Sequence, residues 1–127
     1  MLETGQNPRV LIVDDECVIA DSLALILNQN GFDATAVYSG EAAVETAVTF
    51  NPDVLISDVV MGEMNGIELA LRVSVLLPGC RVILISGNAA TADLLHGAEA
   101  HGYHFEMLAK PVHPRVLLQC LAAPPSE

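Results

Sequence analysis

The chain has 127 residues and a formal net charge of −11 at pH 7, which is the size of one domain with a substantial core. Hydrophobic residues make up 52% of it, and this proportion excludes an intrinsically disordered chain. Only five residues are lysine or arginine, and they form no cluster that would neutralise nucleic-acid phosphates or an anionic membrane surface. We therefore expect neither nucleic acid nor membrane as a partner.

The chain also lacks sequence signals for export. No apolar run reaches the roughly 20 residues of a membrane span, and residues 1–8 lack the basic-then-apolar pattern of a signal peptide. Cys17, Cys80 and Cys120 are odd in number and have no zinc-ligand spacing, which fits a reducing compartment. We expect a cytoplasmic protein with a flexible N-terminus at 1–8, one domain at 9–122 and a flexible tail at 123–127.

Short apolar runs alternate with longer amphipathic stretches, and this alternation indicates βα units around a parallel sheet. Asn30-Gly31 is a typical helix stop, Ser39 is a candidate N-cap, and Asn65 with Glu68 has the spacing of a capping box. The predicted strands are 9–13, 33–37, 54–57, 81–85 and 105–109, and the predicted helices are 16–29, 40–49, 66–77, 90–100 and 114–122.

The run 33–37 is less apolar than the other predicted strands, so we place it at an edge of the sheet. Right-handed crossovers then give a doubly wound, five-stranded parallel sheet of the flavodoxin-like type, with order 2-1-3-4-5 and helices on both faces. In such sheets the ligand crevice lies at the carboxyl ends of the strands where the order reverses. This point lies between strands 1 and 3.

Polar residues follow four of the predicted strands. Asp14 and Asp15 follow the first, Asp58 the third, Ser86 the fourth, and Lys110, the only lysine, the fifth. Converging carboxylates repel one another unless they bind protons or a cation, and oxygen ligands with an open face suit Mg²⁺. A carboxylate can act as a nucleophile and form an aspartyl phosphate, whose oxygens a hydroxyl and an ammonium can contact. The pattern predicts controlled phosphorylation of an aspartate.

These residues resemble those of response-regulator receiver domains of two-component signalling, over residues 9–121. The spacings also fit, with 43 residues from Asp15 to Asp58, 28 from there to Ser86 and 24 from there to Lys110. The matching segments are Val13-Asp14-Asp15-Glu16, Ile56-Ser57-Asp58, Met64-Asn65-Gly66, Ile85-Ser86-Gly87 and Lys110-Pro111.

The resemblance implies that Asp58 accepts a phosphoryl group from a phosphohistidine on a histidine kinase or histidine phosphotransferase. It implies that Asp15, Asp58 and the backbone carbonyl of Val60 ligate Mg²⁺, with Asp14 acting mainly through a bound water. Ser86 and Lys110 would contact the phosphoryl group.

The resemblance also implies a cis peptide at Lys110–Pro111. It further implies a switching face formed by the helix at 90–100, the strand at 105–109 and the helix at 114–122. This face would bind a downstream protein or a second copy of the chain.

Two positions depart from the family pattern. Gly62 stands where the family usually has proline, which would loosen the loop and change metal-site rigidity or the dephosphorylation rate. Met107 stands where the family usually has a switching aromatic residue. Phe105 and Met107 share a face of the predicted strand. The sequence leaves open whether Phe105 substitutes, Met107 itself toggles, or both are simply packed.

Four further points bear on the predicted function. The fold can serve a phosphorylation-independent protein-interaction module, and the departures at Gly62 and Met107 keep this alternative in view. A phosphatase is disfavoured because Val60 stands where a general acid is needed, so we expect no enzyme activity beyond self-phosphorylation and autodephosphorylation. We expect a stand-alone receiver, although the Ala-Pro-Pro-Ser tail also resembles a linker.

Four histidines lack the spacing of a helical metal-binding pair, so solvated or singly hydrogen-bonded side chains are favoured over metal ligands. They are His96, His101, His104 and His113.

Overall fold

The computed structural model describes residues 7–87 and 105–123, and the predicted helix at 90–100 lies outside these ranges. The helices are α1 (Cys17–Gln29), α2 (Gly40–Phe50), α3 (Gly66–Leu76) and α5 (Pro114–Ala122). The strands are β1 (Arg9–Val13), β2 (Asp33–Val37), β3 (Val54–Asp58), β4 (Arg81–Ser86) and β5 (Glu106–Ala109). Most predicted boundaries are correct within one residue. No helix in the described ranges is both long and apolar enough to cross a membrane.

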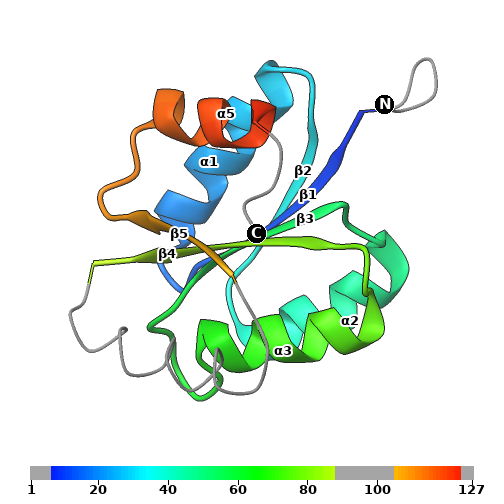
Figure 1. Cartoon of the computed structure of the whole chain (residues 1–127). Helices are drawn as coiled ribbons and strands as arrows, with labels where there is room; N and C mark the ends of the chain where they lie inside the picture. The colour runs from blue at the N-terminus through cyan, green and yellow to red at the C-terminus, as the bar shows by residue number, and fades with distance from the viewer. Residues whose placement is uncertain (1–6, 88–104, 124–127) are drawn as a thin grey trace.

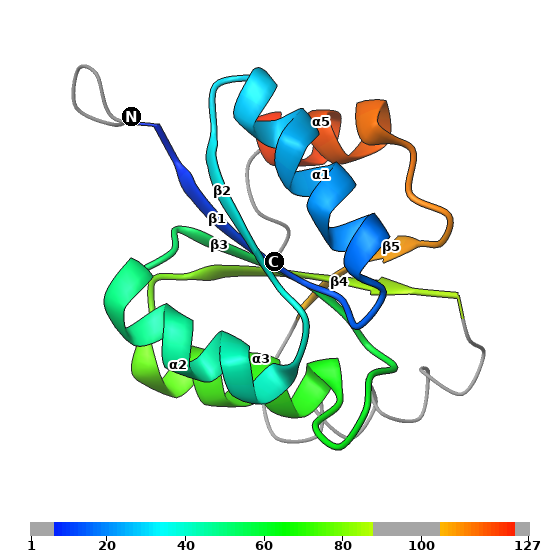
Figure 2. The ribbon, with the colours of Figure 1, turned by 180° about the vertical axis from the view of Figure 1, so that it is seen from behind.

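The five strands are parallel and lie in the order β2-β1-β3-β4-β5, as predicted. Figures 1 and 2 show α1 and α5 on one face of the sheet and α2 and α3 on the other. The register sets Val13 beside Ser57, Asp58 beside Ile85, and Ser86 beside Ala109. The polar residues at these carboxyl ends therefore lie along one edge of the sheet.

Alternate residues of the central strands enter two separate cores, as the two-residue period of a strand requires. Leu11 and Leu55 pack with α2 and α3, whereas Ile12 and Ile56 pack with α1 and α5. All four are at most 1% exposed. The central strands are buried on both faces, so their sequences are apolar at successive positions.

Local signals set the helix ends. The Ser39 hydroxyl accepts a hydrogen bond from the Ala42 amide at 3.1 Å, and the Asn65 side chain accepts one from the Glu68 amide at 2.8 Å. Gly31 has a φ of 91° just after α1, a conformation that glycine adopts without steric cost. The capping residues and the helix stop are therefore confirmed.

Two glycines near the end of β3 give a test of the local packing. A Cβ at Gly66 would overlap the carbonyl oxygen of Asp58 and lie 2.9 Å from Cα of Val59. Because backbone cannot move aside cheaply, we expect Gly66→Ala to destabilise the protein by about 2–3 kcal/mol. A Cβ at Gly62 would meet nothing within 4 Å, so Gly62→Ala is the matched control, expected to be neutral or stabilising by up to ~1 kcal/mol. Urea unfolding measures both, and equal effects would contradict this packing.

Candidate functional site

Three aspartates meet where the carboxyl ends of β1 and β3 lie side by side. One carboxylate oxygen from each of Asp14, Asp15 and Asp58 lies within 4.8 Å of the others. Asp14 and Asp58 are only 3% and 6% exposed, whereas Asp15 faces solvent. The two buried carboxylates need compensating charge or hydrogen bonds, because an isolated buried charge is strongly unfavourable.

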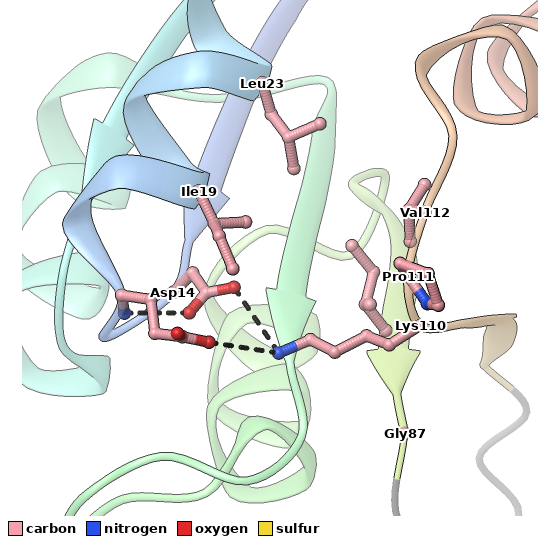
Figure 3. Close-up of a pocket in the computed structure, with 9 residues that line it drawn as sticks. Asp14, Ile19, Leu23, Gly87, Lys110, Pro111 and Val112 are labelled. Atoms are coloured by element: carbon pink, nitrogen blue, oxygen red, sulfur yellow. Dashed lines mark hydrogen bonds and ion pairs between the residues drawn. The ribbon is translucent and has the colours of Figure 1, made fainter.

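Lys110, directly after β5, supplies that charge. Its ammonium donates a hydrogen bond to Oδ2 of Asp58 at 3.0 Å. The same Nζ lies 3.7 Å from Oδ2 of Asp14 and 3.9 Å from Oε1 of Glu16. Figure 3 shows the Lys110 side chain extended so that its ammonium reaches Asp14. One ammonium therefore faces several carboxylates, and the site keeps a net negative charge.

Backbone hydrogen bonds fix the loops that carry these groups. The Val59 amide donates to the carbonyl of Ile85 at 3.0 Å, and the Gly66 amide donates to the carbonyl of Val59 at 2.8 Å. The Lys110 amide donates to the carbonyl of Ser86 at 3.0 Å. The end of β3 is thus tied both to β4 and to the start of α3, and Lys110 is tied to the end of β4.

The surroundings raise the pKa values of both Asp14 and Lys110, which favours the neutral form of the acid and the charged form of the amine. Burial raises the pKa of Asp14 above its ordinary value of 3.8, although a hydrogen bond from the Glu16 amide and the charge of Lys110 partly oppose this. Burial alone would lower the pKa of Lys110, but the hydrogen bond and charge of Asp58, with the charges of Asp14 and Glu16, more than offset it and raise the pKa. The lysine therefore stays an ammonium at neutral pH, whereas the ionised form of Asp14 is less favourable than it is in water.

The donor set fits a hard divalent cation. A crevice of about 410 Å³ is lined by Asp15, Glu16, Asp58, Val60, Gly87 and Lys110. Carboxylate oxygens of Asp15 and Asp58 lie close together in this crevice, and Asp15 is exposed to solvent. This arrangement suits Mg²⁺, which binds one or two carboxylates and keeps several waters. Such a cation would offset the repulsion among the three neighbouring carboxylates.

The other predicted residues lie as follows. Ser86 is the last residue of β4, beside Ala109, and the Lys110–Pro111 peptide is cis. Phe105 and Met107 both pack against the core between the sheet and α2 and α3, so their expected common face is confirmed.

Of the four histidines, only His113 lies in the described ranges. It caps α5 by accepting a hydrogen bond from the Arg115 amide at 3.1 Å. His96, His101 and His104 lie outside those ranges.

Sequence reasoning did not single out Glu16 or the pair Arg81–Glu106. Glu16 begins α1 as its N-cap residue and brings a third carboxylate to Lys110, beside those of Asp14 and Asp58. Its place directly after Asp14-Asp15 was the available signal in the sequence. Arg81 and Glu106 form a bidentate ion pair at 2.6 and 2.7 Å, with side chains only 13% and 12% exposed. This pair joins β4 and β5 far from the acidic crevice, and opposite charges at the starts of two neighbouring strands were its only trace in the sequence.

Two solved structures share this fold closely. A CheY-like response regulator receiver domain protein from Methanospirillum hungatei is 26% identical, with a TM-score of 0.83 and coverage of 92% of each chain. The chemotaxis protein CheY4 of Vibrio cholerae is 27% identical, with a TM-score of 0.80 over 92% of this chain and 98% of that one.

Among curated proteins, the probable transcriptional regulatory protein TcrX of Mycobacterium tuberculosis is 33% identical over 98 residues. The match covers 77% of this chain and 42% of that protein. The DNA-binding response regulator MtrA of the same organism is 29% identical over 110 residues, or 87% of this chain and 47% of MtrA. The chain thus spans about half the length of these relatives. The sequence model of the family described as response regulator receiver domain matches residues 10–122, and the chain belongs to that family.

Proposed function

We propose that the chain accepts a phosphoryl group on Asp58 from a phosphohistidine of a histidine kinase or histidine phosphotransferase, in a reaction that requires Mg²⁺. The observation that carries this proposal is the 3.0 Å contact between the Lys110 ammonium and the buried Asp58 carboxylate, at the edge where Asp14 and Asp15 converge. Family membership over residues 10–122 supports it. A cytoplasmic location belongs to the proposal, because three free thiols suit a reducing compartment.

In this phosphoryl transfer the protein has to position the reacting groups and stabilise the developing negative charge. A carboxylate oxygen of Asp58 attacks phosphorus, the new P–O bond forms as the P–N bond breaks, and the electron pair of that bond stays on the donor imidazole. The Lys110 ammonium lies where it can contact the arriving phosphoryl oxygens while it still faces Asp58. Ser86, at the end of the neighbouring strand, contacts another of those oxygens in this proposal.

Asp15, Asp58 and the carbonyl of Val60 would hold Mg²⁺, with Asp14 acting mainly through a water. Asp15, Asp58 and Val60 line one crevice. When bound, the ion offsets charge between the attacking carboxylate and the phosphoryl group. Val60 is 51% exposed and apolar, so the chain has no general acid at this position for turnover of external esters. We therefore propose self-phosphorylation and autodephosphorylation only.

Phosphorylation would alter the contacts of Lys110 and Ser86 and so shift the position of β5, which lies between them in the chain. The amide of Lys110 is bonded to the carbonyl of Ser86, which couples the ends of β4 and β5. Met107 on β5 and Phe105 just before it are partly buried against the same core and would repack as that strand shifts. A downstream protein or a second copy would bind the changed face at β5 and α5. The helix expected at 90–100, which was assigned to the same face, lies outside the described residues.

Labelling with a small phosphodonor tests the acceptor. We expect acetyl phosphate with Mg²⁺ to add one phosphoryl group, detected by intact-protein mass after acid quenching, and a metal chelator to prevent it. Asp58→Asn should abolish labelling, whereas Asp33→Asn, an exposed carboxylate at the start of β2, should leave it unchanged. Labelling that persists in Asp58→Asn would contradict the proposal, and no labelling of the unaltered chain would favour the phosphorylation-independent module.

The role of the ammonium is separately testable. Lys110→Met removes the charge beside Asp58, and we expect labelling by acetyl phosphate to slow by roughly 10²-fold or more, as when other preorganised donors are removed. Arg115→Met, which removes an exposed cation on α5, is the matched control and should label at the normal rate. A normal rate in Lys110→Met, with folding verified by circular dichroism, would mean that Lys110 does not act on the phosphoryl group.

The burial of the Asp14 carboxylate predicts a stability change with a defined pH dependence. Because the pKa of Asp14 is raised in the folded protein, ionised Asp14 costs stability above that raised value, and the cost disappears as pH falls toward 3.8. With a chelator present, Asp14→Asn should therefore be more stable than the parent at pH 7, with a gain that shrinks on acidification. Urea unfolding across this pH range measures the gain. A variant less stable than its parent at pH 7 would refute the assignment.

A further inference from the structure

A second hollow adjoins the acidic crevice and has the opposite character. This cavity, of about 460 Å³, lies between α1 and the segment that leads from β5 to α5. Figure 3 shows Ile19 and Leu23 on its α1 side and Pro111 and Val112 on the other. Ile85 at the end of β4 completes an apolar wall, while the polar groups are those of Asp14, Glu16 and Lys110.

The cavity and the crevice are contiguous at Lys110. Glu16, Gly87 and Lys110 line both, and the Lys110 ammonium that contacts Asp58 also closes the polar end of the cavity (Figure 3). A phosphoryl group held against this ammonium therefore lies at the boundary between the two hollows. A substituent on its leaving oxygen can reach the apolar wall without leaving the site.

The residues that line the cavity determine which kind of group on the leaving oxygen of the donor fits there. A concave, mostly apolar site with a few polar groups at one end is the usual form of a small-ligand pocket, and this volume lies within the usual range. Ile19 is 37% exposed, so an apolar group placed on it removes hydrocarbon surface from water. Asp14 and Glu16 line the same cavity and repel an anionic substituent. The occupant should be uncharged and apolar.

We propose that this cavity holds the apolar acyl chain of a small acyl phosphate that donates its phosphoryl group to Asp58, so that donors larger than acetyl phosphate are preferred. The inference rests on the proposed function and names the class of small donor. An Asp58 oxygen attacks phosphorus, the P–O bond to the acyl group breaks, and the carboxylate leaves with the electron pair of that bond. The acyl chain occupies the cavity before and during this transfer.

A series of straight-chain donors tests the preference. Acetyl, propionyl and butyryl phosphate have leaving carboxylates of similar basicity, so differences in rate report on the chain. At donor concentrations below saturation, with Mg²⁺, each methylene buried should raise the labelling rate by about fourfold, and butyryl phosphate should exceed acetyl phosphate by roughly tenfold or more. Equal rates along the series would overturn the inference, leaving labelling by acetyl phosphate as independent evidence for Asp58.

Variants at neighbouring positions of α1 locate the effect. Ile19→Phe narrows the cavity and Ile19→Ser removes part of its apolar wall, so in both variants the ratio of the butyryl phosphate rate to the acetyl phosphate rate should fall toward onefold. Val18→Phe is the matched control, because Val18 is 77% exposed, and it should keep the preference. A preference that survives both Ile19 variants would overturn the assignment to this cavity. Absence of labelling by every donor would overturn the proposed function, and this inference with it.

Discussion

The contact between Lys110 and Asp58 joins residues 52 positions apart and depends on the whole sheet, since the lysine must reach across the end of β4 to the end of β3. Asp14 and Asp58 are almost fully buried, and without this ammonium they would be neighbouring buried charges of one sign. The lysine stem passes close to Gly87, where an added Cβ would lie 3.2 Å from Cβ of Lys110. A small residue at the end of β4 thus leaves room for the cation that stabilises the site.

The same lysine separates two environments of different chemistry. On one side lies a crevice with three carboxylates, suited to a hard cation and a phosphoryl group; on the other lies a cavity lined by α1 and the residues after β5, which is mostly apolar. Burial raises the pKa of Asp14, even though the charge of Lys110 opposes the rise. The polar crevice and the apolar cavity therefore meet at one side chain, and this arrangement would support both the proposed acceptance of a phosphoryl group and the proposed selection among donors.

Much of this architecture could be predicted from sequence because the buried strands are short, continuous apolar runs and each ends in a polar residue at the same sheet edge. The positions of Asp14, Asp15, Asp58 and Lys110 follow from that rule. The features that could not be predicted depend on contacts between residues that are distant in the sequence. Asp58 belongs to β3 rather than following it, because it pairs with Ile85. Gly66 is required because α3 begins against the Asp58 carbonyl. The ion pair of Arg81 with Glu106 spans 25 residues, and no local pattern specifies it.

The most direct test of the central claim is chemical trapping of the acceptor residue. The chain would be phosphorylated with acetyl phosphate and Mg²⁺, reduced with borohydride, digested and sequenced by mass spectrometry, since an aspartyl phosphate is reduced to homoserine where a free carboxylate is not. The account predicts homoserine at position 58 alone. Homoserine at position 14 or 15, or a reduced side chain at Glu16, would show that Asp58 is not the nucleophile.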